Sequence, residues 1–314
     1  MAPVFRAPEP YLIIILMLPS LSVLPQYLVP KQALTAFAGW VAGKERGWVT
    51  TEIIRRFVTK YKVDMGEALD SDIASYASFN AFFTRALKPG ARPLAKADLT
   101  CPVDGAVSQF GLIDKGQIYQ AKGHSYSATA LVGGDAALAA QFDGGSFACL
   151  YLSPKDYHRI HMPAEGRLVQ MTYVPGDLFS VNPTTAQGVP GLFARNERVV
   201  CVFESSLGAA KQNFVLVLVG ATIVGSMATV WHGVVNPPRL PDVKTWRYAD
   251  QHLLFKQGDE MGRFLLGSTV VMLFPEGRLA FNPAWTPGLA IRLGEKMADY
   301  SKQSNQSNQS NQFS

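Results

Sequence analysis

Two stretches, Phe214-Val-Leu-Val-Leu-Val219 and Thr269-Val-Val-Met-Leu-Phe274, decide the fold, because both are short, apolar and rich in β-branched side chains. From about residue 100 onward, runs of this kind alternate with Gly, Pro, Asn and Asp. Short β-branched runs bounded by turn residues are typical of strands. The other runs are Ala106–Ile113, Ser146–Leu152, Gly166–Val174, Val199–Glu204 and Thr222–Val230. We therefore expect a body built mainly of β-strands.

The earlier part of the chain has a helical period instead. Residues 34–41 carry apolar side chains at i, i+3, i+4 and i+7, which is one face of a helix. Gly43-Lys-Glu-Arg-Gly47 interrupts this helix, and a second one is expected to begin near residue 50. Two short helices are also expected, one capped by Ser78 and one at Ala136–Phe142. Helices followed by strands predict an α+β fold rather than a doubly wound sheet.

Composition and charge narrow the class of protein. The chain has 314 residues, of which 48% are hydrophobic and 17% charged, a mixture too apolar for a disordered protein. The net charge is +5, and residues 1–62, with eight basic and three acidic residues, hold all of the excess. A nucleic-acid-binding enzyme would spread its basic residues through the body, so no nucleic-acid partner is expected. The three cysteines are widely spaced, which indicates a reducing compartment.

The N-terminal leader is apolar but interrupted. No charged residue occurs between Glu9 and Lys31, yet the continuous apolar run Tyr11–Leu18 has only eight residues. A transmembrane helix needs about 20, and three prolines follow before Lys31. A single membrane span and a cleaved signal peptide are therefore weaker alternatives than insertion into a membrane surface.

The two expected N-terminal helices suit such a surface. Trp40 and Trp48 lie on them, and Arg55, Arg56 and Lys60 flank the apolar face of the second helix. Amphipathic helices with aromatic and basic residues in this arrangement bind anionic lipid interfaces. A helical hairpin packed on the core would show the same pattern, with its charges simply solvated. The uncharged leader beside the helices favours the membrane.

These changes in composition divide the chain into three expected parts. Residues 1–62 form an apolar leader and basic amphipathic helices for membrane association. Residues 63–300 form a β-rich catalytic domain. Residues 301–314 are a polar run of mainly Ser, Asn and Gln, which we expect to be disordered and to carry no chemistry.

Two of the five histidines form a close pair in Tyr157-His158-Arg-Ile-His161-Met-Pro163. A His-x-x-His pair could bind a metal, but no H-E-x-x-H pattern or cysteine pair accompanies it, so no metal site is expected. Two imidazoles this close are better suited to proton transfer, because histidine titrates near neutral pH. Two ordinary surface histidines would give the same pattern, and this stretch alone leaves that interpretation open.

Two further residues become candidates from their turns. Pro102-Val-Asp104-Gly-Ala106 places an aspartate in a tight turn just before a strand. Gly267-Ser268 forms a corner at the entrance to an apolar run, but it does not match the G-x-S-x-G elbow of the α/β-hydrolases. Asp104, His161 and Ser268 are far apart in the sequence and by themselves establish no site.

Three motifs occur in order along the chain: the Asp-Gly of Pro102–Ala106, Tyr157–Pro163 and Leu266-Gly-Ser-Thr269. With them come Tyr61–Met65, Ala121–His124, Tyr173–Asn182, Leu192–Arg198, Val219–Gly225 and Glu260–Phe264. This ordered set resembles the bacterial phosphatidylserine decarboxylases from about Gln26 to about Pro275. Two features differ from that family: the leader is longer and more apolar, and the Ser/Asn/Gln tail is foreign to it.

The resemblance implies a proenzyme that cleaves itself. His161 acts as the base, is oriented by Asp104 and activates the hydroxyl of Ser268, in the manner of a serine-protease triad. That hydroxyl attacks the carbonyl of Gly267, where the missing side chain leaves the carbonyl accessible. The cut lies between residues 267 and 268, and Ser268 becomes a pyruvoyl group.

The resemblance also implies the reaction. The pyruvoyl group from Ser268 forms a Schiff base with the amine of phosphatidylserine, CO2 leaves, and phosphatidylethanolamine is released as a product of phospholipid biosynthesis. His158 is implied as the acid that protonates the carbon, and Phe179 is a candidate for substrate contact. Pyruvoyl is then the cofactor, and neither pyridoxal phosphate nor a metal is expected.

The partners and the location follow from the same resemblance. The large subunit, 1–267, and the small subunit, 268–314, stay associated, and a homodimer is expected. The substrate is phosphatidylserine, and residues 1–62 bind the anionic membrane surface that contains it. We therefore expect the protein at the cell membrane, peripheral on the cytoplasmic face.

Two other functions would use the same residues. A serine hydrolase would apply Ser268, His161 and Asp104 to an external ester and would stay a single chain of 34.2 kDa. A non-catalytic β-domain that binds lipid headgroups would not need His158 or Ser268. The decarboxylase differs from both because it must be found as two fragments.

Overall fold

The computed structural model describes residues 23, 25–28, 30–207, 211–222, 226–265, 269–277 and 279–300. Three stretches discussed above lie outside these ranges: the apolar leader with Tyr11–Leu18, the polar tail 301–314, and Gly267-Ser268. Within the described ranges, no helix is both long and apolar enough to cross a membrane.

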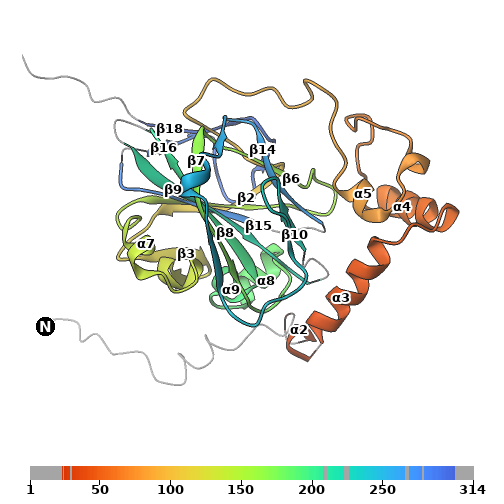
Figure 1. Ribbon diagram of the computed structural model, residues 1–314, viewed down its shortest axis with the longest axis horizontal. Coiled ribbons are helices and arrows are strands. Elements are labelled where there is room, and N and C mark those ends of the chain that lie inside the picture. The colour runs from red at the N-terminus through yellow and green to blue at the C-terminus, as the bar shows by residue number, and fades with distance from the viewer. Residues whose placement is uncertain are drawn as a thin grey trace, which may run out of the picture.

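Short and medium helices form the N-terminal part of the described chain, on one side of the body (Figure 1). They are α2 (Pro25–Leu28), α3 (Lys31–Ala42), α4 (Trp48–Tyr61), the 3-10 turn η1 (Ile73–Ser75) and α5 (Phe79–Phe83). The two amphipathic helices expected from the sequence are confirmed as α3 and α4. The cap of α5 is also confirmed, because the Ser78 side chain accepts a hydrogen bond from the Ala81 N–H at 3.2 Å.

These helices have a small core of their own. Ile54, Val63, Phe82 and Phe83 are buried together. Phe57 packs against this cluster, with its ring centroid 5.9 Å from that of Phe82 and 6.1 Å from that of Phe83. Aromatic side chains thus join α4 to α5 before the chain enters the body.

The body is built from strands, as the sequence predicts. They are β1 (Leu99–Thr100), β2 (Gly105–Leu112), β3 (Gln117–Ala121), β4 (His124–Ser127), β5 (Ser146–Tyr151), β6 (Arg159–His161), β7 (Gly166–Val174), β8 (Arg198–Ser205), β9 (Gln212–Val219), β10 (Met227–Thr229), β11 (Gly233–Asn236), β12 (Lys244–Arg247), β13 (Leu254–Phe255), β14 (Glu260–Phe264), β15 (Thr269–Phe274), β16 (Leu279–Phe281), β17 (Ala290–Ile291) and β18 (Lys296–Tyr300). The expected strand at Thr222–Val230 is reduced to β10, with residues 223–225 outside the described ranges. The fold is therefore mixed helix and sheet with a β-rich body.

The largest sheet has nine strands, in the order β12-β7-β8-β9-β15-β5-β2-β17 with β13 also paired to β7. In its centre, Thr269 of β15 lies opposite Tyr151 of β5, and Tyr151 lies opposite Ala106 of β2. This register brings Thr269, which follows Ser268 in the chain, to the same end of the sheet as the loop that carries Asp104.

Alternate residues of the central strands face two different cores, as strand geometry requires. In β15, Val270, Met272 and Phe274 belong to one core, and Val271 and Leu273 belong to the other. Both faces of the sheet are therefore covered. This is why the central strands are continuous apolar runs rather than alternating apolar and polar residues.

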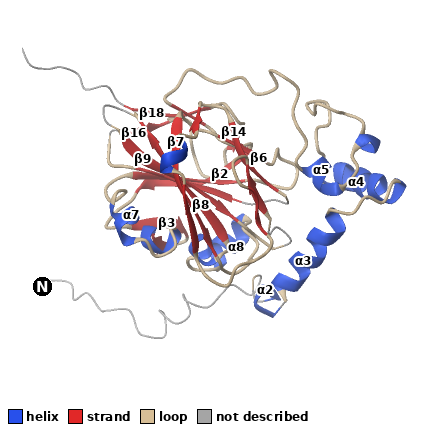
Figure 2. Ribbon diagram, in the orientation of Figure 1, coloured by secondary structure: helices blue, strands red, loops and turns tan. Residues whose placement is uncertain are grey.

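Different elements cover the two faces of the large sheet (Figure 2). One face packs against short helices: α6 (Ala128–Leu131), α7 (Ala136–Ala140), α8 (Pro183–Gly188) and α9 (Leu192–Arg195). The other packs against the small sheets β11-β10-β14-β6 and β1-β18-β16. The sequence predicts α7, at Ala136–Phe142, but not α6, α8 or α9.

Candidate active site

A charged cavity of about 540 Å³ lies where the segment after α4 meets the ends of β2 and β5. Its charged lining consists of Lys62, Asp64, Glu67, Arg85, Arg92, Asp104, Lys155, Asp156, Arg292 and Glu295. Tyr151 and Tyr157 also line it. The cavity therefore contains Asp104 and lies one strand away from Thr269.

Asp104 is buried in the wall of this charged cavity, because Gly105 brings its loop against β5. A Cβ at Gly105 would lie 2.2 Å from the carbonyl oxygen of Tyr151, so no larger residue fits. The Asp104 carboxylate accepts hydrogen bonds from Arg92 Nε at 2.9 Å and Arg92 Nη2 at 2.6 Å. Its Oδ1 also accepts the Leu293 N–H at 2.8 Å. Donors other than a histidine thus occupy both carboxylate oxygens.

His161 ends β6, with both ring nitrogens hydrogen-bonded. Nδ1 lies 2.8 Å from the Gly258 carbonyl oxygen, which can only accept, so Nδ1 carries the proton. Nε2 is then the nitrogen with the lone pair, and it accepts a hydrogen bond from the Tyr157 hydroxyl at 3.2 Å. Burial lowers the pKa of His161 and raises the pKa of Tyr157 to about 12. At neutral pH, His161 is therefore a neutral base that faces a protonated phenol.

Asp104 and His161 lie in adjacent segments, but the described hydrogen bonds do not join their side chains. The His161 N–H donates to the Pro102 carbonyl at 2.9 Å, two residues before Asp104. Tyr157 lines the charged cavity with Asp104 and contacts the His161 ring. The negative charge of Asp104 raises the pKa of His161, against the larger effect of burial. Asp104 thus acts on His161 through its charge, and Gly258 and Tyr157 orient the ring.

His158 has a different setting: it is fully buried, packs against Phe83 and has the buried cation Arg85 nearby. Its Nδ1 donates to the Asp156 carbonyl at 2.7 Å, and its ring centroid is 4.0 Å from that of Phe83. No described residue pairs with its Nε2. Burial lowers the pKa of His158 to about 3, so the imidazole is neutral and keeps a free lone pair at Nε2. Within the described ranges, no group of three or more potential metal ligands is found.

The described residues before Gly267-Ser268 contact His158, and those after it enter the large sheet. The Phe264 N–H, at the end of β14, donates to the His158 carbonyl at 3.0 Å. Thr269, at the start of β15, is fully buried, and its Oγ1 has no partner among the described atoms. Gly267 and Ser268 themselves lie outside the described ranges. Two buried polar atoms, His158 Nε2 and Thr269 Oγ1, thus have no described partner in the elements that lead to this position.

Phe179 lies in another part of the body, buried below the first helices. The Tyr27 ring meets it edge-on with centroids 5.0 Å apart, and Lys31 Nζ lies 3.5 Å from its ring centroid. Gln26 is hydrogen-bonded next to it, since its Oε1 accepts the Ser180 N–H at 2.9 Å. Phe179 therefore supports α2 and the start of α3 on the body. Its role in substrate contact stays a prediction.

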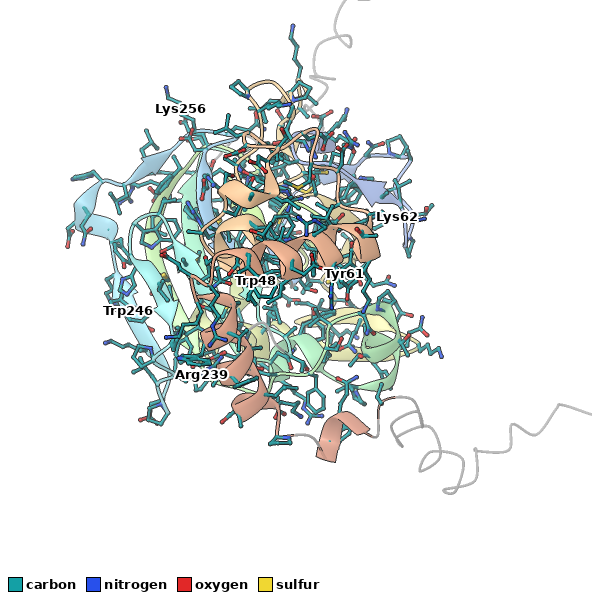
Figure 3. The ribbon with its side chains drawn as sticks, turned by 90° about the vertical axis from the view of Figure 1, so that its right-hand side faces the viewer. Trp48, Tyr61, Lys62, Arg239, Trp246 and Lys256 are labelled. Carbon is teal, nitrogen blue, oxygen red and sulfur yellow. The ribbon has the colours of Figure 1, made fainter. Side chains whose placement is uncertain are left out.

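A second cavity, of about 460 Å³, lies between α3 and the body. From α3 it is lined by Thr35, Ala36, Gly39 and Trp40, and from the rest of the chain by Asn80, Ser226, Val234, Pro237, Arg239 and Leu265. Figure 3 shows Arg239 beside α3. The Leu265 N–H donates to the Ser226 carbonyl at 3.0 Å. This cavity is mainly apolar and approaches the cleavage position from the side of the helices.

The outer surface of α3 and α4 is also apolar. A groove of about 540 Å³ between them is lined by Leu34, Phe37, Ala38, Val41, Ala42, Thr50, Ile53, Phe57, Tyr61 and Phe79, with Lys44, Arg56 and Lys60. Figure 3 shows Trp48, Tyr61 and Lys62 along α4. Trp48 is 80% exposed and Phe37 is 63% exposed. An exposed apolar strip with a basic rim thus occupies the side of the molecule next to the second cavity.

Three contributors to the site escape sequence reasoning. Arg92 lies in a Pro-Gly-rich loop, and nothing in a single sequence pairs it with Asp104. The Gly258 acceptor is a backbone carbonyl, which cannot be recognised from the identity of a side chain. Tyr157 belongs to the recognised histidine motif, but its contact with His161 Nε2 depends on the local fold.

Comparison with known proteins gives one consistent result. The family model described as phosphatidylserine decarboxylase matches residues 79–299, and a second model, described as PSD, matches residues 21–62. A Variovorax paradoxus protein is 77% identical over 278 residues, which cover 88% of this chain and 97% of the relative. A Polaromonas naphthalenivorans protein is 74% identical over 287 residues, 90% of this chain and 98% of the relative. A Dechloromonas aromatica protein is 69% identical over 277 residues, 88% and 97% of the two chains. Each relative is named phosphatidylserine decarboxylase proenzyme.

Proposed function

The chain belongs to the phosphatidylserine decarboxylase family, and on that premise we propose which of its residues carry out the chemistry. Its activity is the conversion of phosphatidylserine into phosphatidylethanolamine and CO2, and it is made as a self-processing proenzyme. The charged cavity with His161 is assigned to self-cleavage, and the buried His158 to turnover. The pyruvoyl group, formed at Ser268, is the proposed cofactor.

Self-cleavage begins with a proton transfer to His161. Its Nε2 is the nitrogen with the lone pair and takes the proton of Ser268 Oγ as that oxygen attacks the carbonyl carbon of Gly267. The carbon–nitrogen bond breaks, and an ester links the two residues. Elimination then releases the Gly267 carboxylate and leaves dehydroalanine, which takes up water and loses ammonia to give the pyruvoyl group. The balanced result is a large subunit, 1–267, and a small subunit, 268–314.

Three groups help His161 in this step. The Gly258 carbonyl holds the Nδ1 proton, so the lone pair stays on Nε2. Once Nε2 has gained a proton, the Tyr157 oxygen, 3.2 Å away, can accept a hydrogen bond from it. Asp104 stabilises the resulting positive charge through the Coulomb interaction that raises the pKa of His161. Asp104 thus supplies the charge in this triad, and the other two groups supply the orientation.

Two buried polar atoms without described partners, His158 Nε2 and Thr269 Oγ1, are the groups that we propose to hold the pyruvoyl group. The group supplies the electron sink for the loss of CO2. His158 Nε2, buried and without a described partner, is the proposed site that holds the proton released when the substrate amine reacts. It then returns that proton to the carbon that has lost CO2. Phe83, packed against the His158 ring, keeps water away from this proton.

The apolar cavity under α3 is the proposed route for the lipid. It is lined by Leu265, three residues before Ser268, and by Trp40 and Arg239. An apolar lining suits the glycerol and acyl parts, and the guanidinium of Arg239, which also binds Glu197 at 3.2 Å, can face the phosphate. Phe179 is kept as a proposed indirect contributor, since it supports the helices that roof this cavity.

The N-terminal helices are the proposed membrane contact. The groove between α3 and α4 is apolar with a rim of Lys44, Arg56 and Lys60, and Trp48 stands exposed beside it. Such a surface suits the boundary of an anionic bilayer, where each basic residue contributes about 1 kcal/mol. We place the protein on the cytoplasmic face of the cell membrane, as a homodimer, with residues 1–62 as the anchoring part and 63–300 as the catalytic domain.

One observation carries this assignment: His158 is fully buried, its Nε2 has no described partner, and its backbone carbonyl is bonded to Phe264 of the strand that leads to Gly267-Ser268. Intact-mass analysis of active protein is the direct test. Two fragments are expected, cut between residues 267 and 268, with the smaller one blocked to N-terminal sequencing. The Ser268→Ala variant should remain one inactive chain. An active enzyme that stays uncut would instead support a hydrolase.

A further inference from the structure

We propose that Arg92 is a positioning residue for self-cleavage, which fixes the Asp104 carboxylate beside His161 without touching the reacting atoms. The inference rests on the proposed role of Asp104. Arg92 Nε lies 2.9 Å from Asp104 Oδ1, and Nη2 lies 2.6 Å from Oδ2. The side chains of this pair are only 8% and 9% exposed. A two-pronged contact of this kind fixes the carboxylate in direction as well as in distance.

The guanidinium of Arg92 is itself held in place. Its Nη1 donates to the Ala91 carbonyl at 2.8 Å, and its Nη2 also donates to Glu67 Oε2 at 2.7 Å. Glu67 Oε1 accepts from Arg292 Nη1 at 2.9 Å. Hydrogen bonding to Arg92 is the largest cause that lowers the pKa of Glu67, so this carboxylate is ionised. The chain Arg292–Glu67–Arg92–Asp104 therefore joins four separate segments by charged hydrogen bonds.

The charge balance explains why Glu67 is needed. Asp104 influences His161 by its charge, because donors from Arg92 and Leu293 occupy its oxygens. The Arg92–Asp104 pair by itself carries no net charge. With Glu67 added, the three groups Glu67, Arg92 and Asp104 have a net negative charge. The Arg292 side chain, at the other end of the hydrogen-bonded series, is 59% exposed and is screened by solvent. Arg92 can therefore fix Asp104 without removing its effect on His161.

The test is the rate at which freshly made precursor is cut, followed by pulse-chase and gel in full-length protein. Arg92→Gln should slow cleavage about 10–100-fold, the usual range for a residue that supports a reactive group. Arg92→Lys should recover part of this loss, since an ammonium keeps the charge but not the planar fork. In the Asp104→Asn background, Arg92→Gln should add no further delay, because both changes remove one interaction.

Arg167→Gln is the matched control. Arg167 also makes a forked contact, to Glu204 Oε1 at 2.8 and 3.2 Å, but on β7 and β8 outside the charged cavity. This variant should be cut at the normal rate. To separate positioning from folding, each change is also placed in the uncleavable Ser268→Ala precursor. There, Arg92→Gln and Arg167→Gln should lower the melting temperature by similar amounts.

Three results would overturn the role of Arg92: normal cleavage of Arg92→Gln, delays that add fully to those of Asp104→Asn, or a delay matched by Arg167→Gln. The proposed function fails differently. If Ser268→Ala were still cut, or if Asp104→Asn were cut at the normal rate, the assignment of the self-cleavage residues would be wrong, whatever Arg92 does.

Discussion

His158 and His161 lie three positions apart and burial lowers the pKa of both, yet their immediate contacts differ. His161 adjoins a charged cavity, where Arg92, Asp104 and Glu67 form ion pairs. His158 lies against Phe83, is fully buried and has no described partner at Nε2. Charge around a histidine supports a proton transfer that creates an imidazolium, while an apolar setting favours the neutral ring. One short segment thus carries two neutral imidazoles with different contacts, which supports the proposal that they serve two different steps.

The largest effect that would sharpen this comparison is expected at His158. His158→Gln should be cut into two subunits but should lose decarboxylation by about 10²–10⁴-fold, the range for a lost acid–base group. The measurement is phosphatidylethanolamine formed per mole of cut enzyme. His124→Gln, in the β3–β4 hairpin, is the control and should be unaffected. Full activity of His158→Gln would remove His158 from the mechanism.

The second expected effect concerns Asp104, in the wall of the charged cavity. Asp104→Asn should slow self-cleavage by about 10–100-fold, because the amide lacks the negative charge that raises the pKa of His161. The precursor half-life, read from a gel, is the measurement. Asp135→Asn is the control, since this residue caps α7 and asparagine caps equally well. A normal half-life for Asp104→Asn would reduce Asp104 to a structural turn residue.

A smaller effect is expected at Tyr157. Tyr157→Phe removes the hydroxyl that lies 3.2 Å from His161 Nε2, and one hydrogen bond of about 1 kcal/mol corresponds to about fivefold in rate. Self-cleavage should slow by that amount. Tyr126→Phe is the matched control, because its buried hydroxyl has no partner among the described residues. Equal delays in both variants would show that Tyr157 acts through packing alone.

The smallest effect concerns stability against acid. The pKa of His158 is about 3 in the folded protein and about 6.5 in an unfolded chain, so below pH 6.5 the unfolded state binds more protons. The stability that this difference provides is complete above about pH 6.5 and is lost as the pH falls toward 3. Melting of the Ser268→Ala precursor should therefore drop on acidification, and less so with His158→Phe added. An identical pH dependence in both proteins would contradict the buried neutral state.

The sequence was most informative where a pattern is local. The strands at Gly166–Val174 and Thr269–Phe274 were predicted to the residue, because each is a short run rich in apolar side chains between turn residues. Helices α8 and α9 were missed, since their packing on the sheet rather than their own period makes them helical. Membrane contact by α3 and α4 stays a prediction that their exposed apolar faces support.

The candidate site was predictable only in its residue types. The histidine motif and the Asp-Gly turn stand out in the sequence, and the structure places their segments side by side. The partner of Asp104 could not be foreseen, because Arg92 reaches it through a fold that brings distant loops together. The environment that sets the pKa of each histidine could not be predicted either, because it depends on whether Phe83 or the charged cavity lies next to the imidazole.

The position of β15 determines how the cut enzyme behaves. This strand begins directly after the proposed cut, and it lies between β5 and β9, both of which belong to the other fragment. The backbone hydrogen bonds of β15 are therefore shared with the large piece on both sides, and its apolar side chains reach into both cores. Separating the two subunits would require breaking the hydrogen bonds of β15 to both β5 and β9 in the middle of the sheet. The proposed cut creates two new chain ends but does not release a fragment. The mature enzyme therefore keeps its small subunit for as long as the sheet stays folded.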